Sequence, residues 1–180
     1  MSWMRIVALI FSVVTVSLTS CAAPQEAPVP PPTVLEAALP PEGTVRLTGA
    51  LREPGELTVE KLRAMPLRTV DVAYRSGKGP QQHSVTGVPL ADLFPVSALA
   101  TTDRKHDELT FAVLAVGADG YSALLSYGEV SPDFGNRGIL LAVTEDGADL
   151  ARPGIAVPGD VEGARYVSDV VELHVVCTGP

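Results

Sequence analysis

Cysteine is scarce in this chain of 180 residues, which contains only Cys21 and Cys177. Cys21 lies near the N-terminus, before the expected folded domain, so Cys177 is the one thiol left for the folded part. An internal disulfide and a cysteine-based metal cluster are therefore excluded. Because Cys177 lies in an apolar run, we expect it to be buried as a small hydrophobic residue. A functional role for this thiol would need a second chain or a bound metal as its partner.

Positive charge is in short supply as well. The chain has 13 lysines and arginines against 21 aspartates and glutamates, a formal net charge of −8 at pH 7. Nucleic-acid binding depends on clustered positive charge that neutralises phosphates. The acidic balance therefore predicts no nucleic-acid partner, and it argues against electrostatic attachment to an anionic membrane surface.

Familiar catalytic signatures are missing. There is no Gly-x-Ser-x-Gly elbow, no His-Glu-x-x-His helix and no Walker loop. The histidines His83, His106 and His174 are far apart and lack the spacing of metal ligands. The sequence therefore assigns no catalytic residue and predicts no metal site.

The N-terminal residues have the pattern of a bacterial export signal. Arg5 precedes an apolar run from Ile6 to Val16, which is shorter than the roughly 20 residues needed to span a bilayer. Leu18-Thr19-Ser20-Cys21 then fits a lipobox, in which small residues precede a cysteine that is lipidated and becomes the new N-terminus. We interpret residues 1–20 as a lipoprotein signal peptide and Cys21 as the lipidation site. The alternative is an uncleaved membrane anchor.

Residues 21–43 combine the lipidated cysteine with a stretch rich in proline and alanine. Such a composition favours extended conformations and forms a semi-rigid spacer. We expect this tether to hold one folded domain, residues 44–180, away from the membrane. The protein is then exported and lipid-anchored to the bacterial cell envelope, on the periplasmic or another extracytoplasmic face, and the membrane is its first partner.

The domain itself is predicted to be rich in β-strands. Apolar patterns indicate strands at 45–51, 68–75, 138–143, 154–160 and 166–176, and a hairpin at 109–127. The run at 138–143 is continuously apolar, which is typical of a strand that is buried on both faces. Short helices are expected at 57–66, capped by Thr58, at 87–94, and after a capping box that starts at Ser126. Since no β-α-β alternation occurs, we expect an α+β domain with a mixed, barrel-like sheet and short helices.

The segment "VDVAYRSGKGPQQHSVTGV" (70–88) carries the main candidate site. Arg75, Ser76, Gly77, Lys78 and Gly79 follow a predicted strand, and His83 lies further along. Glycine N–H groups can approach an anion closely, arginine offers a bidentate fork, and lysine adds a point charge. Histidine adds a donor that titrates near neutrality. The alternative is an ordinary flexible connection from a strand to a helix, whose charges are solvated.

Three further polar residues are weaker candidates for ligand contacts. Tyr121 follows Asp119-Gly120, where turn formation alone explains the pattern. Arg137 lies in a predicted turn, and Arg165 precedes a predicted strand, so both are also explained as surface charges.

Five segments together resemble a known family. They are "LTGALREPGELTVEKLRAMP", "TGVPLADLF", "GADGYSALLSYGEV", "GILLAVTEDGADL" and "RPGIAVPGDVEGARYVSDVVELHV". Their order and spacing over residues 45–176 resemble the sulfite-oxidase-like molybdopterin-binding domain, of the oxidoreductase molybdopterin-binding family. The resemblance implies that family's fold, and it makes molybdopterin a possible cofactor.

The chain departs from this family at the metal. In the family a cysteine thiolate just after the corresponding strand ligates molybdenum, whereas residues 73–77 here contain no cysteine. Ser76 is the nearest chemical relative, but a hydroxyl is a poor substitute for a soft thiolate. We therefore expect no cofactor.

Three functions remain open at this point. The first is a degenerate, non-redox module that binds a small anionic ligand or an envelope protein. The second is a molybdopterin-dependent oxidoreductase domain or subunit, as the resemblance implies. The third is a purely structural envelope lipoprotein, so whether the chain is an enzyme is undecided by its sequence.

Overall fold

The computed structural model describes residues 39–102 and 104–179. The expected signal peptide, Cys21 and most of the expected tether lie outside these residues, so export and lipidation stay predictions. Among the described helices, none has both the length and the apolar character needed to cross a membrane. The first strand, β1, begins at Thr44, where the sequence places the start of the domain.

Sheet A has five strands in the order β2-β1-β9-β5-β6. Its central strand, β9, pairs in parallel with β1 and antiparallel with β5, so the sheet is mixed. Two antiparallel pairs, β1–β2 and β5–β6, complete it. In sheet order the strands are Gly55–Thr58 (β2), Thr44–Gly49 (β1), Val170–Cys177 (β9), Phe111–Gly117 (β5) and Ser122–Ser126 (β6).

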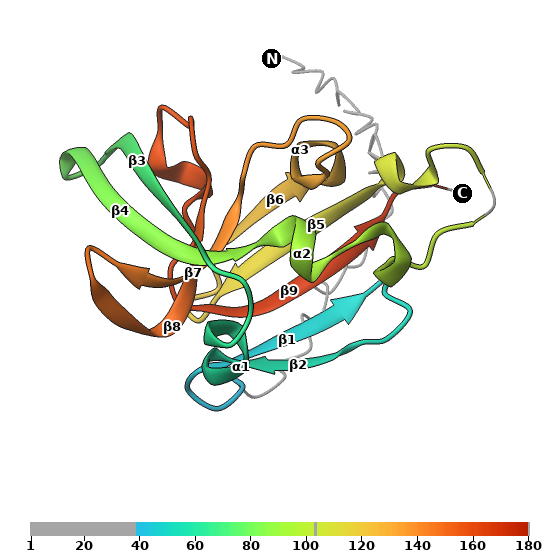
Figure 1. Cartoon of the computed structure of the whole chain (residues 1–180), viewed down its shortest axis with the longest axis horizontal. Helices are drawn as coiled ribbons and strands as arrows, with labels where there is room; N and C mark the ends of the chain where they lie inside the picture. Colours follow the sequence, from blue (N-terminus) through green and yellow to red (C-terminus); the bar gives the residue numbers. More distant parts are fainter. Residues whose placement is uncertain (1–38, 103, 180) are drawn as a thin grey trace, which may run out of the picture. The chain divides into compact units, whose positions relative to one another are not determined.

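Sheet B has four antiparallel strands in the order β3-β4-β7-β8. They are Arg68–Ser76 (β3), Gly79–Pro89 (β4), Leu140–Glu145 (β7) and Ala148–Ala156 (β8). Figure 1 shows the β3–β4 ribbon and the β7–β8 hairpin extending to one side of sheet A. Two sheets with few short helices agree with the α+β class that the sequence predicts.

The helices are short, and two of them, α1 and α3, begin at residues whose side chains cap them. They are α1 (Val59–Arg63), α2 (Leu90–Leu93), α3 (Tyr127–Val130) and the 3₁₀ turns η1 (Val96–Ala98), η2 (Asp107–Thr110) and η3 (Gly163–Arg165). Thr58 caps α1 by accepting a hydrogen bond from the Lys61 amide. Ser126 and Glu129 form the expected capping box at α3. Both N-terminal caps that the sequence predicts are therefore confirmed.

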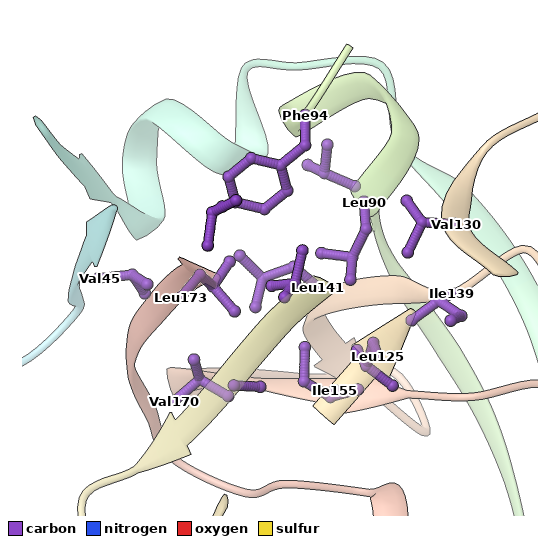
Figure 2. Packing of buried hydrophobic residues seen from close by; sticks show 14 of the residues in the cluster. Val45, Leu90, Phe94, Leu125, Val130, Ile139, Leu141, Ile155, Val170 and Leu173 are labelled. Carbon is purple, nitrogen blue, oxygen red and sulfur yellow. The ribbon is translucent and has the colours of Figure 1, made fainter. Parts of the chain in front are cut away.

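The main core fills the space between the two sheets. The residues labelled in Figure 2 come from both sheets and from the α2 and α3 regions: Val45, Leu90, Phe94, Leu125, Val130, Ile139, Leu141, Ile155, Val170 and Leu173. Removal of this apolar surface from water is the main stabilising contribution to the fold. The hydroxyl of buried Tyr127 donates to the Phe94 carbonyl oxygen at 3.0 Å, so this polar group in the core is satisfied.

A second, smaller cluster lies on the opposite face of sheet B. It consists of Val72, Val85, Leu140, Ala142 and Ala156, all buried. The cluster exists because β7 is apolar at every one of its first four positions, so its side chains bury on both faces. The sequence-based prediction of a doubly buried strand at 138–143 is confirmed for residues 140–143, and the observed strand begins two residues later than predicted.

Residues 79–89 differ from the sequence-based expectation. The sequence predicts a flexible connection here and a helix from residue 87, whereas the structure has the long strand β4, with the helix confined to Leu90–Leu93. Polar residues occupy both faces of the first half of β4, so the period-two pattern of Gln81, His83 and Val85 is not marked by hydrophobicity. The candidate anion-binding residues 75–79 lie at the end of β3, at the start of β4 and in the tight turn between these two strands.

The prediction that Cys177 is buried is wrong, because the residue is exposed. It is the last residue of β9 and lies beyond Val175, the last core residue of that strand. Its sulfur is 3.6 Å from the Thr110 hydroxyl oxygen. The apolar run correctly indicates a strand that enters the core, but the strand extends two residues beyond the last core residue, Val175.

Gly49 provides a test of the parallel β1–β9 pairing. Its φ is +84°, and a Cβ there would lie 2.1 Å from the Val175 carbonyl oxygen. Gly120 has nearly the same φ, +82°, but a Cβ there would meet no atom within 4 Å. We predict that Gly120→Ala costs about 1–2 kcal/mol for the left-handed backbone alone. Gly49→Ala should cost about 1–3 kcal/mol more, because of the clash with the backbone.

Urea unfolding of both variants, followed by circular dichroism, measures the difference. Equal losses for the two variants would contradict the close approach of β1 and β9 at this position.

Candidate functional site

A cavity of about 620 Å³ lies over the outer face of sheet B. The second apolar cluster forms its floor through Val72, Val85, Ala142 and Ala156. A volume of this size falls in the range of small-molecule sites, which combine apolar walls with a few polar groups. We call this space the sheet B cavity.

The connection between β8 and β9, residues 157–169, covers the cavity, and we call it the cover segment. Tyr166 of this segment stacks on Tyr74 of β3, with ring centroids 4.1 Å apart. Burial raises the pKa of Tyr166 to about 12, so its hydroxyl stays protonated and donates to the Val157 carbonyl oxygen at 2.8 Å. Gly163 lies against the Tyr74 ring, where a Cβ would be 2.7 Å from a ring carbon. The wall is therefore closely packed.

The tip of the β3–β4 hairpin forms one end of the cavity. Ser76, Gly77 and Lys78 line it, as the anion-site hypothesis requires. The Ser76 hydroxyl accepts a hydrogen bond from the Lys78 amide at 3.1 Å and donates to the Gly79 carbonyl oxygen at 3.3 Å. Ser76 is thus used to close its own turn. Lys78 is exposed, so any charge that it contributes is well screened by water.

Arg75 does not line the cavity. Its guanidinium pairs with Glu162, with Nη2 at 2.6 Å and Nε at 2.9 Å from the same carboxylate oxygen. The Arg75 amide also donates to the Val161 carbonyl oxygen at 2.8 Å. The arginine that the sequence places in the anion site therefore attaches the cover segment to β3 in the structure, and its charge is already balanced.

His83 lies at the cavity between two carboxylates. Its Nδ1 is 2.8 Å from an Asp146 oxygen and 3.5 Å from a Glu145 oxygen. The hydrogen bond to His83, and a second one from the Ser84 amide, lower the pKa of Asp146. The three side chains each offer one ligand atom, all within 4.8 Å of one another, so they could hold a divalent cation. The same geometry is also explained without a metal, by the hydrogen bond between the His83 ring and Asp146.

The three weaker candidates lie outside the cavity lining. Arg165 makes a double hydrogen bond to Asp160, at 2.7 and 2.8 Å, and reaches Glu129 at 3.0 Å. Arg137 contacts Asp160 at 3.4 Å, and the Tyr121 hydroxyl donates to the Ala164 carbonyl oxygen. All three residues fasten the cover segment to its surroundings, and any role in ligand binding stays a prediction.

Arg152 is a charged cavity residue that the sequence analysis did not indicate. It lies on β8 and lines the cavity, and its Nη1 is buried without a hydrogen-bond partner among the residues that the structure describes. The available signal was an arginine directly before Pro153 and an apolar run, inside a stretch that is a strand. The sequence predicts a strand from residue 154, whereas β8 already begins at Ala148, so Arg152 fell outside the predicted strand.

The donor set of the cavity does not fit a molybdenum that is ligated by cysteine. No cysteine occurs among its lining residues, and Cys177 lies beside Thr110 instead. The oxygen and nitrogen donors at the cavity are harder ligands than the thiolate used in the resembling family.

No protein-family model and no curated protein matches this chain. Among solved structures, the chain is similar to the sulfane dehydrogenase SoxCD from Paracoccus pantotrophus, with 20% sequence identity and a TM-score of 0.59. The likeness covers 73% of this chain and 37% of that chain. It shows a distant relationship of fold, and this chain spans well under half of the length of its structural neighbour.

Arg165 and Arg137 form a matched pair for testing how the cover segment is held. We predict that Arg165→Met lowers the free energy of unfolding by about 1–2 kcal/mol, because it leaves partly buried Asp160 without its main partner. Arg137→Met should cost under about 0.5 kcal/mol, since its one contact is long and largely solvated.

The Arg165 effect should also depend on pH. The hydrogen bond from Arg165 holds the pKa of Asp160 below its ordinary 3.8. A lowered pKa in the folded state stabilises the protein above the ordinary value, and this stabilisation is lost as the pH falls through the folded value. Urea titrations at pH 7 and near pH 3 should therefore show a smaller difference between wild type and Arg165→Met in acid. A difference that does not change would contradict this assignment.

Proposed function

We propose that this chain is a lipid-anchored envelope protein whose domain binds a small organic molecule in the sheet B cavity and carries out no redox chemistry. The observation that carries the proposal is the cavity itself, of about 620 Å³, with an apolar floor and polar groups at its edge. Its ligand lies over sheet B and under the cover segment. The domain acts as a binding module.

The scaffold is proposed to be that of the sulfite-oxidase-like molybdopterin-binding domain. Support comes from the five ordered sequence segments and from the likeness of fold to a sulfane dehydrogenase. The dehydrogenase activity of that protein is not carried over, because the metal-ligating thiolate has no counterpart among the cavity residues. We infer that this branch of the fold kept a pocket and lost the metal centre.

The likeness of fold also favours a second candidate, a molybdopterin-dependent oxidoreductase domain or subunit. In that case the cofactor would be held without a cysteine, by groups such as Lys78 and Arg152, and would supply the redox chemistry. A purely structural envelope lipoprotein is the third candidate, and it would leave the cavity without a use.

Metal and pterin analysis separates the first two candidates. The protein is purified from a host that makes molybdopterin and is examined by elemental analysis and by pterin fluorescence after acid release. We predict molybdenum and pterin well below one equivalent. Stoichiometric amounts of either would overturn the non-redox proposal.

Anchoring through Cys21 has its own test. We predict that Cys21→Ser moves the protein from the membrane fraction to the soluble fraction, because the acyl chains that would hold it cannot be attached. Ser20→Ala keeps a small residue before the cysteine and should remain with the membranes. Detergent-phase partitioning of both variants gives the result, and a membrane-bound Cys21→Ser protein would refute the lipoprotein assignment.

A further inference from the structure

Arg152 has an unusual position for a charged residue. Its Nη1 is buried at the sheet B cavity and has no hydrogen-bond partner within the described residues. Arg152 as a whole is half-buried, so the unsatisfied group is this one nitrogen. A buried hydrogen-bond donor without a partner is costly, and such atoms are rare unless another molecule completes the site. The protein alone does not account for the placement of this side chain.

The neighbouring acids do not neutralise Arg152. Asp149, three residues earlier on β8, lies 3.4 Å from the Arg63 guanidinium. Glu145 is 3.5 Å from the His83 ring. Asp169 also lines the cavity, but no ion pair within 4.0 Å joins it to Arg152 among the contacts of the described residues. An anion from outside the chain can fill this role.

The surroundings of Arg152 restrict the chemistry of that anion. On sheet B, Arg152 occupies the edge strand β8, and the buried residues Ala142 and Ala156 lie on the floor of the same cavity. A fully hydrated inorganic ion would gain nothing from an apolar floor. A molecule with one anionic head and an apolar body would satisfy both features, since guanidinium matches a planar carboxylate through two parallel hydrogen bonds.

We propose that Arg152 is the anion-binding residue of the cavity and that its ligand is a small organic carboxylate with an apolar body. This inference rests on the proposed function, in which the cavity binds a small molecule. The sequence analysis placed the candidate anion site at the tip of the β3–β4 hairpin, whereas this proposal places the anionic group of the ligand at Arg152. Lys78 at that tip is exposed, whereas the Arg152 Nη1 atom is buried.

Matched probes test the inference on the protein without residues 1–38, and in parallel on the lipidated full chain in detergent. A panel of apolar carboxylates, from benzoate to naphthoate and decanoate, is compared with the corresponding primary amides by ligand-observed NMR and calorimetry. We expect carboxylates to bind at least about tenfold more tightly than their amides, as hydrogen bonds between charged groups imply. Arg152→Gln should remove this preference. Lys78→Gln serves as the control and should change affinity less than about threefold, because exposed charges contribute little.

Each outcome has a distinct meaning. If carboxylates and amides bind equally, or if Lys78→Gln loses the preference instead of Arg152→Gln, the assignment to Arg152 is wrong while the cavity remains a binding site. If no compound of the panel binds, the proposed function fails with it.

A measurement without ligand checks the starting point. Arg152→Met should raise the midpoint of thermal unfolding of the free protein, because it removes a buried donor atom that has no partner. A lower midpoint would mean that Arg152 is already satisfied within the fold, and this would count against the inference.

Discussion

The structure depends on the burial of β7 on both of its faces. Leu141 and Val143 point into the main core, while Leu140 and Ala142 lie in the cluster on the opposite face of sheet B. A sheet with two apolar faces must be covered on both. Sheet A covers one face, and the cover segment covers the other. The cavity lies where this second cover stands over the apolar floor, so the proposed binding site arises from the same requirement to cover both faces of sheet B.

Most elements of this fold were predictable, because their signals are local. Caps at Thr58 and Ser126, the Asp119-Gly120 turn and the continuous apolar run of β7 each require only neighbouring residues, and all are confirmed. Strand β4 was missed since its polar first half carries no hydrophobic pattern. The burial of Cys177 was wrongly predicted for a related reason: the end of a core depends on neighbouring strands, which the sequence of one strand does not contain.

The site was less predictable, because its residues are assembled by long-range contacts. The sequence placed Arg75 in an anion site, and the structure pairs it with Glu162, which is 87 positions away. His83 and Asp146, which nothing in the sequence connects, lie in contact across β4 and the β7–β8 turn. Such distant partners decide whether the positive charge of an arginine is paired with a carboxylate or is left to bind a ligand. For this reason Arg152 became a candidate only when the absence of a partner within the described residues was visible.

The parallel pairing of β1 with β9 has a consequence for the order of folding. Strand β9 is the last described strand, yet it lies in the middle of sheet A, between β1 and β5. A chain that emerges from a ribosome, or from a translocation channel, N-terminus first presents β1 about 120 residues before its neighbour arrives, and pairing over such separations is slow. Sheet A can close only after β9 has emerged, so this topology itself delays compaction of the sheet until residues 170–177 are available.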